Sequence, residues 1–360
     1  MTQSNALPPT TKPFHQAYEP LSPQPPLSVG HKILTGDRAT GQLHLGHYVG
    51  SLQQRVALQA HNDQTILVAD MQGLTDNGNT PAKVAGNILN VVADYLAAGI
   101  DPSQTTICLQ SGLPALAELT MFYSNLVTIA RLERNPTVKN EIQGKGFGRS
   151  IPAGFLTYPI SQAADITAFQ ATQIPVGDDQ LPMLEQTNEI VRKINSLAGK
   201  PILTECQPML SNMPRLPSVD GKAKMSKSLG NAITLDASDA DIAKAVKAMY
   251  TDPNHLTVDA PGQVEGNVVF TYLDAFYPDP AFVESLKVHY RRGGLGDGKT
   301  KAILTECLQA MIAPMREKRQ ALIADKQYLI DVLKAGTEKA REESSQTLTQ
   351  VKQAFGLNIF

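Results

Sequence analysis

The chain has 360 residues, of which 42% are hydrophobic and 18% are charged, and its formal net charge is −2. This length allows two domains and one sizeable core, and the composition is that of an ordinary globular protein. No uninterrupted apolar stretch approaches the roughly 18 residues of a membrane helix, so we expect no membrane partner. The near-neutral charge excludes a protein that coats DNA through a strongly basic surface.

The first 28 residues do not resemble a secretory signal, because they lack an apolar core. They contain seven prolines between Pro8 and Pro26, so we predict a disordered Pro-rich tail over residues 1–29. The three cysteines (Cys108, Cys206 and Cys307) lie far apart, without metal-ligand spacing. We therefore expect buried, reduced thiols in a cytoplasmic protein, and no site in which protein side chains alone bind a metal.

From Lys32 onward, short apolar runs alternate with helical patterns. This alternation predicts a parallel sheet covered by helices on both faces, an α/β domain of the Rossmann-like kind over residues 30–235. Such sheets bind ligands at the carboxyl ends of their strands. The predicted strands are Ile33–Thr35, Thr65–Ala69, Thr105–Leu109 and a run ending at Val176, and the predicted helices are His44–Ala60, Pro81–Gly99, Ala115–Arg131 and Leu181–Leu197.

The pattern changes after the Pro-rich stretch Pro208–Pro217, because the following residues are nearly all helical. Ser238 with Asp241 resembles a capping box at the start of a helix that runs to Tyr250. We predict an all-helical C-terminal domain over residues 236–360, joined to the first domain by the loop around Lys224. Its further predicted helices are Val268–Tyr277, Pro280–Tyr290, Thr300–Ala324 and Gln327–Phe355.

A candidate phosphate site is the segment His44-Leu45-Gly46-His47. It lies one turn after a predicted strand and opens a helix, so its backbone N–H groups and the helix dipole favour an anion. His44 and His47 share a helix face, and Gly46 would let an adenine ring lie against the helix. Arg38, in the preceding turn, adds a permanent cation. The alternative is a helix start with two solvated histidines, which has about equal weight for this segment alone.

A second candidate is Gly177-Asp178-Asp179-Gln180, which directly follows a predicted strand. A glycine there permits a ligand to approach closely, and an acid after it can accept from ribose hydroxyls. Taken alone, these residues are better explained as a strand-to-helix turn in which Asp179 caps the helix.

The third candidate runs from Gly221 to Asn231 (GKAKMSKSLGN) and holds three lysines and two serines between glycines. A mobile cationic loop of this composition can close over a triphosphate and stabilise a pyrophosphate leaving group. A run of charged residues is usually solvated surface. Because this run follows an HxGH helix start in an α/β chain, we favour the phosphate-binding interpretation.

HxGH early and KMSKS late, in that order, resemble the two signatures of the class I aminoacyl-tRNA synthetases. Within that class, nearly the whole chain past residue 30 resembles the tryptophanyl-tRNA synthetases. Three segments carry this closer likeness: TGDRATGQLHLGHYVGSL (35–52), FLTYPISQAADI (155–166) and IPVGDDQ (174–180).

The resemblance implies an ATP site. Arg38, Ala39, Thr40, His44, Gly46 and His47 would contact ATP, with Gly177, Asp178 and Asp179 on the adenosine. The backbone of Leu216 would touch adenine, and Lys224, Met225, Ser226, Lys227 and Ser228 would close on the phosphates. Many bacterial relatives carry Gln-Pro-Ser at 38–40, Asn at 47 and Gly-Glu-Asp at 177–179, which suggests a sub-branch.

The family joins the amino acid's carboxylate to the α-phosphate of ATP, expels pyrophosphate, and then transfers the aminoacyl group to tRNA. By resemblance, Lys224, Lys227 and His47 would be the catalytic groups. Catalysis would rest on positioning and charge stabilisation, with Mg²⁺ bound through the ATP phosphates.

The segment Tyr158–Asp165 is expected to form a turn into a helix that lines the amino-acid pocket. A buried carboxylate at Asp165 can accept the indole N–H of tryptophan. Asp165 could instead be a helix N-terminal acid that the dipole favours. Gln162 leaves tyrosine as an alternative substrate, because a Gln three residues before an Asp can also bind the hydroxyl group of a phenol. By position, Tyr158 and Gln180 complete the pocket.

Segments outside the pocket favour L-tryptophan. The block from Thr35 to Leu52, IPVGDDQ, and the lack of an extra C-terminal RNA-binding module resemble the tryptophanyl branch. The resemblance further implies that the helical domain reads the anticodon of tRNA(Trp) and that the enzyme is a homodimer. The apolar stretch Ala115–Ile129 is the candidate dimer surface.

Two other classes remain open. A small-molecule nucleotidyltransferase can also carry an HxGH helix start, although it needs no second helical domain. A non-catalytic regulatory relative often loses a signature, whereas both are present here.

Overall fold

The computed structural model describes residues 29–210, 216–221, 225, 231–357 and 359. Residues 1–28, all but the last residue of the predicted tail over 1–29, lie outside this part of the chain.

The described residues form two compact units. The larger unit comes from Pro26–Gln42, Ser51–Asn212 and Leu322–Phe360, and the smaller unit from Leu43–Gly50 and Met213–Ala321.

The larger unit is built on a five-stranded sheet in the order β3-β2-β1-β4-β5, and every neighbouring pair is parallel. The strands are β1 (Lys32–Arg38), β2 (Asp63–Ala69), β3 (Thr105–Leu109), β4 (Gln173–Val176) and β5 (Gln207–Leu210). The predicted parallel sheet is confirmed. Strand β5 was missed because Pro208 suggested a loop, but an edge strand tolerates proline.

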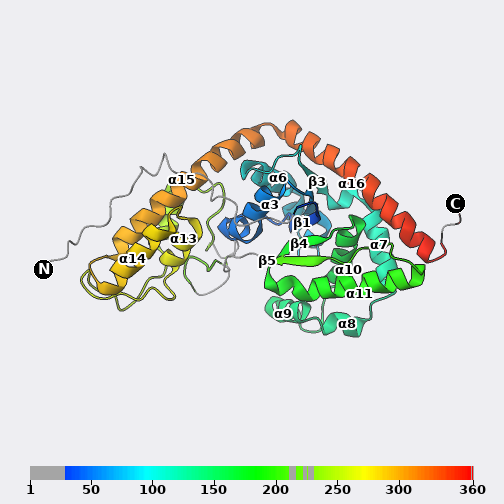
Figure 1. Ribbon diagram of the computed structural model, residues 1–360, viewed down its shortest axis with the longest axis horizontal. Helices are drawn as coiled ribbons and strands as arrows, with labels where there is room; N and C mark the ends of the chain where they lie inside the picture. The colour runs from blue at the N-terminus through cyan, green and yellow to red at the C-terminus, as the bar shows by residue number, and fades with distance from the viewer. Residues whose placement is uncertain (1–28, 211–215, 222–224, 226–230, 358, 360) are drawn as a thin grey trace. The chain divides into compact units, whose positions relative to one another are not determined.

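Helices lie on both faces of this sheet, with α10 and α11 on one face and α3 and α6 on the other (Figure 1). Leu34, Leu67 and Cys108 face the core formed with α7, α10 and α11. The helical segments are α3 (Gln53–Leu58), α4 (Asp70–Gly73), α5 (Pro81–Ala85), α6 (Ile88–Ala97), the 3₁₀ turn Gln110–Gly112, α7 (Pro114–Ser124), α8 (Ile129–Glu133), α9 (Pro136–Lys145), α10 (Ala153–Ala168), the 3₁₀ turn Asp178–Gln180, α11 (Leu181–Ala198) and α16 (Lys326–Ala354).

Helix α16 covers the edge strand β3, although it comes from the end of the chain. A β-carbon on Gly336 would lie 2.0 Å from the carbonyl oxygen of Ile107, so only glycine allows this close approach. The hydroxyl of Thr337 accepts the backbone N–H of Leu109 at 3.0 Å, which gives this edge donor a partner. Helix α16 therefore packs as part of the larger unit. The domain boundary predicted at residue 235 had grouped this helix with the other C-terminal helices.

Three predicted helices are interrupted. The stretch 115–131 divides into α7 and α8, because Thr128 starts a new helix by accepting the backbone N–H of Arg131. The stretch after Pro81 divides into α5 and α6 at Gly86-Asn87. The helix predicted from His44 consists of α2 (Leu45–His47), a π-helical turn (Tyr48–Leu52) and α3.

The helix-rich C-terminal region is confirmed. Its helices in the smaller unit are α12 (Asp239–Lys247), α13 (Val268–Phe276), α14 (Pro280–Arg292) and most of α15 (Asp297–Ala324). Ser238 caps α12 as predicted, since its hydroxyl accepts the backbone N–H of Asp241 at 3.1 Å. The aromatic side chains of Phe270, Tyr272 and Tyr290 are buried in this unit.

The three cysteines are free and buried, as predicted. Burial raises the pKa of the Cys206 thiol to about 11 and that of Cys307 to about 12, and it raises the pKa of Cys108 further. Such thiols are inert at neutral pH. None of the described helices is both long and apolar enough to span a membrane.

Candidate functional site

The carboxyl ends of β1 and β4 lie side by side in the sheet, although these strands are far apart in the chain. The sheet therefore has its topological switch point here, which is where open parallel sheets bind ligands. Two sequence-predicted segments lie at this edge: Arg38 ends β1 and is followed by residues 39–40, and residues 177–180 follow β4.

Arg38 is a partly exposed cation at the end of β1. Its Nη1 lies 3.7 Å from Oδ1 of Asp76, which also pairs with Lys145 at 2.5 Å. Burial favours a higher pKa for Asp76, but the hydrogen bond from Lys145 and the charge of Arg38 outweigh it and lower this pKa. Ala39 is fully buried. Sequence reasoning missed Asp76 and Lys145.

The turn after β4 presents two exposed carboxylates, Asp178 and Asp179. A β-carbon on Gly177 would lie 2.8 Å from Oδ1 of Asp179, so a side chain at this position would displace the exposed Asp179 carboxylate. The backbone carbonyl of Asp179 accepts from Thr137 Oγ1 at 2.5 Å, and the carboxylate accepts from Gln180 at 3.3 Å. The turn thus holds acceptors suited to hydroxyl groups just beyond the end of the strand.

Tyr158, Gln162 and Asp165 lie on one face of α10, since spacings of four and three bring residues together on a helix. The prediction of a turn at Tyr158 was wrong: Pro159 lies inside the helix, and the three residues follow its first turn. Asp165 lies in the C-terminal half of α10, so the alternative that it is a helix N-terminal acid is also wrong.

The Tyr158 end of this face contacts the neighbouring groups. The Tyr158 hydroxyl donates to Glu141 Oε2 at 2.9 Å, and burial together with this carboxylate raises the pKa of Tyr158, while the charge of Arg38 opposes the rise. Gln162 Nε2 lies 3.5 Å from Gln180 Oε1. The predicted residues of α10 are therefore close to those at the ends of β1 and β4.

Asp165 itself is buried, with only 4% of its surface exposed. Gln110 Nε2 donates to both of its carboxylate oxygens, at 3.0 and 2.9 Å, and Gln72 Nε2 donates to Oδ2 at 2.8 Å. Burial raises the pKa of Asp165 to about 7, and the hydrogen bond from Gln110 opposes this rise. Sequence reasoning missed both glutamines, although each follows a buried strand at the carboxyl edge of the sheet, the position where polar residues suggest a site.

The HLGH segment lies in the smaller unit, where His44 caps α2. The Nδ1 atom of His44 accepts the backbone N–H of Gly46 at 3.1 Å, and Nδ1 of His47 accepts the backbone N–H of His44 at 3.2 Å. A neutral imidazole that accepts at Nδ1 carries its proton at Nε2. Both rings thus have an Nε2–H group, which is a donor suited to phosphate oxygens.

The same unit brings the HLGH segment next to Met225, the one residue of the KMSKS segment that the structure describes. Leu45 N–H donates to the carbonyl of Ile233 at 2.9 Å, just past the loop, and Met225 within the loop is buried. A β-carbon on Gly46 would lie 2.9 Å from the His44 ring and 3.4 Å from the Met225 sulfur. The His44 ring and the Met225 sulfur therefore lie beside the position that a side chain at residue 46 would occupy.

Of the other residues predicted to contact ATP in this unit, the structure describes only some. Leu216 is buried, next to Pro217, whose carbonyl accepts from the Tyr272 hydroxyl at 2.9 Å. Lys224, Ser226, Lys227 and Ser228 lie outside the described residues.

The apolar stretch that suggested a dimer surface is largely used within the larger unit. Helix α7 packs against both α10 and α16, which bury Leu116, Leu119 and Tyr123. This double contact explains the width of its apolar face. Met121 and Ile129 remain exposed, at 69% and 65%.

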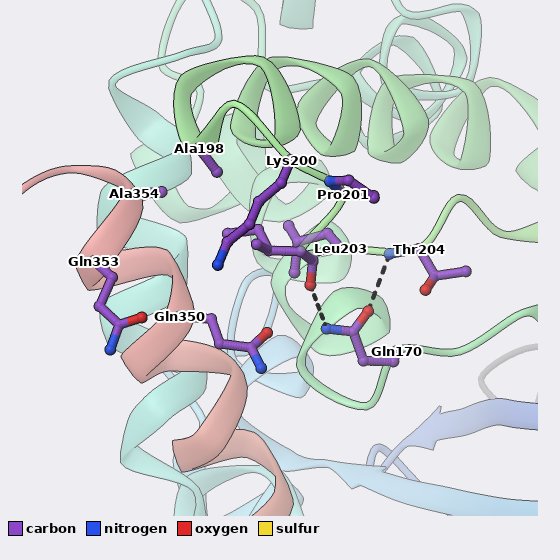
Figure 2. A pocket seen from close by; sticks show the side chains of 10 residues that line it. Gln170, Ala198, Lys200, Pro201, Leu203, Thr204, Gln350, Gln353 and Ala354 are labelled. Carbon is purple, nitrogen blue, oxygen red and sulfur yellow. Dashed lines mark hydrogen bonds between the residues drawn. The ribbon is translucent and has the colours of Figure 1, made fainter.

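A hollow of about 750 Å³ lies in the larger unit near the N-terminal ends of β4 and β5, away from the carboxyl ends (Figure 2). The amide of Gln170 is bonded within its wall, donating to the Ile202 carbonyl and accepting from the Thr204 N–H, both at 3.0 Å. None of the predicted site residues lines it. The lining residues are Gln170, Ala198, Lys200, Pro201, Ile202, Leu203, Thr204, Gln350, Gln353 and Ala354.

Comparison with known proteins shows the family to which the chain belongs. The family model of tRNA synthetases class I (W and Y) matches residues 30–313. The tryptophan–tRNA ligase of Clostridium longisporum is 56% identical over 333 residues, which cover 91% of this chain and 97% of the relative. That of Lactococcus lactis subsp. lactis is 53% identical over 336 residues, covering 91% and 98%.

A solved structure is also similar, that of tryptophanyl-tRNA synthetase from Campylobacter jejuni complexed with ADP and tryptophan. Its TM-score is 0.79 at 29% sequence identity, over 91% of this chain and all of that one. The chain therefore belongs to the class I tRNA synthetases of the W and Y family and, within it, to the tryptophan–tRNA ligases.

Proposed function

We propose that this chain activates L-tryptophan with ATP, forming tryptophanyl-adenylate and pyrophosphate, and transfers the tryptophanyl group to tRNA(Trp). The observation that carries the choice of amino acid is the 53–56% identity, over 91% of the chain, to relatives named tryptophan–tRNA ligase. The buried acceptor at Asp165 supports it, because indole offers one N–H donor and no acceptor.

The phosphate chemistry is assigned to the two signatures. His44 and His47 would donate from Nε2 to phosphate oxygens, and the Nδ1 bonds described above support this orientation. Lys224 and Lys227 would stabilise the charge that develops on pyrophosphate as it leaves. Met225, Ser226 and Ser228 complete the loop, and Mg²⁺ bound through the phosphates would neutralise part of their charge.

The strand ends of the larger unit are assigned to ATP as well. Arg38 supplies a cation, while Ala39 and Thr40 supply backbone and hydroxyl groups. Asp178 and Asp179 would accept from the ribose hydroxyls, and Gly177 would contact the adenosine through its backbone. The remaining ATP contacts are proposed for Gly46 and for the backbone of Leu216.

The amino-acid pocket is assigned to one face of α10 and its neighbour after β4. Asp165 would accept the indole N–H, while Tyr158, Gln162 and Gln180 would line the rest. Gln162 was the argument for tyrosine, but its amide nitrogen faces the side-chain oxygen of Gln180. This contact gives Gln162 a partner within the protein.

The wider setting is also proposed. The helices of the C-terminal region would bind tRNA and read its anticodon, the active enzyme would be a homodimer, and it would work in the cytoplasm.

The deciding experiment is ATP–pyrophosphate exchange across the twenty amino acids. We expect exchange with tryptophan, and exchange driven by tyrosine instead would overturn the assignment. Tryptophan-dependent exchange without charging of tRNA(Trp) would favour the nucleotidyltransferase alternative, and a lack of any exchange would favour a non-catalytic relative.

A variant tests the pocket separately. Asp165→Ala should raise the KM for tryptophan and leave the KM for ATP close to that of the unmodified chain. An unchanged KM for tryptophan would remove Asp165 from the pocket.

A further inference from the structure

Gln110 is a buried amide in direct contact with Asp165, and its sequence context predicted no role for it. It begins the 3₁₀ turn after β3 and is 2% exposed. Its Oε1 accepts the backbone N–H of Gln72 at 3.0 Å, while its Nε2 faces both oxygens of Asp165. A flipped amide would direct an NH₂ group at the Gln72 N–H and an oxygen at the carboxylate, so both contacts fix its orientation.

The hydrogen bonds on Asp165 are unevenly distributed. Oδ2 accepts from Gln72 and Gln110, whereas Oδ1 accepts from Gln110 alone among the described residues. A carboxylate has about four acceptor positions. The arrangement leaves Oδ1 as the oxygen with capacity for one more donor, and indole has one N–H group.

We propose that Gln110 is a positioning residue for amino-acid recognition: its amide orients the Asp165 carboxylate and favours its ionised form, so that Oδ1 accepts the substrate's indole N–H. This inference rests on the proposed function, because it concerns the same pocket. The backbone N–H of Gln72 anchors Gln110, and the Gln72 side chain supplies a further donor to the same carboxylate.

The charge state of Asp165 decides whether it can accept. A protonated carboxyl carries an O–H donor, which would oppose an N–H donor from the substrate. Burial raises the pKa of Asp165 to about 7, and Gln110 opposes that rise. Without Gln110, more of the enzyme would therefore be protonated at neutral pH.

Within the part of the chain that the structure describes, few other titratable groups lie near this carboxylate. Cys108 on β3 has its own pKa raised by burial and by Asp165. Asp70 on α4 accepts the backbone N–H groups of Met71 and Ser111. The pKa of Asp165 itself responds to burial and to Gln110.

The test compares three substitutions of glutamine by methionine, a side chain of similar length without N–H donors. Gln110→Met removes the proposed positioning group, and Gln72→Met removes only the second donor and leaves the backbone anchor. Gln64→Met is the matched control: Gln64 is a buried glutamine of β2 that donates to the Arg55 carbonyl and to Thr105 Oγ1.

Exchange kinetics with tryptophan and ATP give the readouts. Gln110→Met should raise the KM for tryptophan about 10- to 100-fold, the range for losing a hydrogen bond to a charged group, and should leave the KM for ATP unchanged. A plot of kcat/KM for tryptophan against pH reports the ionisations of the free enzyme, and its fall at low pH is the acid limb. Gln110→Met should move this acid limb to higher pH. Gln72→Met should change the KM for tryptophan and the position of the acid limb less than Gln110→Met does, and Gln64→Met should change neither.

A residue that only supports the fold would not move the acid limb. The inference is therefore overturned if Gln110→Met keeps the acid limb in place, whatever happens to KM, or if Gln64→Met moves it equally. It is also overturned if Asp165→Asn retains the same limb, because the limb would then belong to another group.

Two further outcomes remain distinguishable. If Gln110→Met does not fold, Gln110→Glu replaces it: an oxygen can still accept from Gln72, but the second oxygen faces Asp165, so the acid limb should move to higher pH, and an unmoved limb counts against the inference. If the unmodified chain shows no tryptophan-dependent exchange, the proposed function fails before Gln110 is tested.

Discussion

The sulfur of Met225 lies beside Gly46, so that a β-carbon on this glycine would be 3.4 Å from it. The same β-carbon would lie 2.9 Å from the ring of His44, which caps the helix by accepting the Gly46 N–H. A side chain at this position would thus crowd the capping ring of His44, whereas 3.4 Å is an ordinary contact distance to the methionine of the second signature.

Gly46→Ala should displace the His44 ring and weaken its cap. We expect a loss of about 1–2 kcal/mol in the free energy of unfolding, the range for a lost N-cap, and a raised KM for ATP. Thermal unfolding and exchange kinetics measure the two effects.

Gly50→Ala is the matched control for this substitution. Gly50 is exposed in the adjoining π-helical turn, with open space at its β-carbon position. It should therefore have little effect. A Gly46→Ala enzyme with an unchanged KM for ATP would show that the position of His44 does not matter to ATP.

A buried ion pair supports the end of β1. Arg55 Nη1 lies 2.6 Å from Asp37 Oδ2, which also accepts from the Tyr95 hydroxyl at 2.8 Å. Burial favours a lower pKa for Arg55, but Asp37 outweighs it, so the guanidinium remains charged.

Asp37→Asn removes the charge that faces Arg55. Leaving one partner of a buried ion pair without the other lowers the free energy of unfolding by about 3–5 kcal/mol. Tyr95→Phe removes one hydrogen bond and should lower it by about 1 kcal/mol. Urea unfolding gives both values. A cost for Asp37→Asn no larger than that for Tyr95→Phe would contradict the importance of this charge.

The pH dependence of stability gives a third prediction. The pKa of Asp165 is raised from 3.8 to about 7 on folding, so the folded state binds its proton more tightly than the unfolded state. The resulting contribution to stability is complete below pH 4 and is lost as pH rises towards 7, with a slope of at most about 1.4 kcal/mol per pH unit.

Urea unfolding between pH 4.5 and 7.5, without substrates, measures this slope. Asp165→Asn removes the titrating group, so its unfolding free energy should fall less steeply across the same range. Parallel curves for the two proteins would mean that Asp165 is not protonated near neutral pH.

The proposed homodimer is tested by gel filtration, which should give about twice the mass of the chain. Met121 and Ile129 are the exposed apolar residues of the candidate surface, so Met121→Asp should lower the apparent mass if this surface forms the contact. A monomer in the unmodified protein would refute the dimer, and a dimeric Met121→Asp protein would place the contact elsewhere.

The sequence predicted the parallel sheet because hydrophobic runs such as Thr65–Ala69 are short, β-branched and separated by helical patterns. It could not predict where helices break, because Thr128 suits both a helix interior and an N-cap and only packing decides. Strand β5 was hidden by Pro208, which is acceptable only because β5 lies at an edge.

The site was predicted through segments that resemble a family, which is why Asp165 was found and Gln110 was not. A glutamine after a strand has no distinctive pattern. Its role depends on α10 bringing Asp165 to the end of β3, a contact between residues 55 positions apart in the chain. The placement of α16 was missed for a similar reason, since only the contact with Ile107 explains why a glycine occupies position 336 in the middle of a helix.

The packing of α16 on β3 also has a consequence during synthesis of the chain. Ribosomes make a chain from its N-terminus, so β3 emerges long before the helix that covers it. Until Gly336 and Thr337 have been made, the outer edge of the sheet that carries Gln110 lacks its cover. A nascent or C-terminally truncated chain would therefore expose an unpaired strand edge at β3, the strand that leads to Gln110.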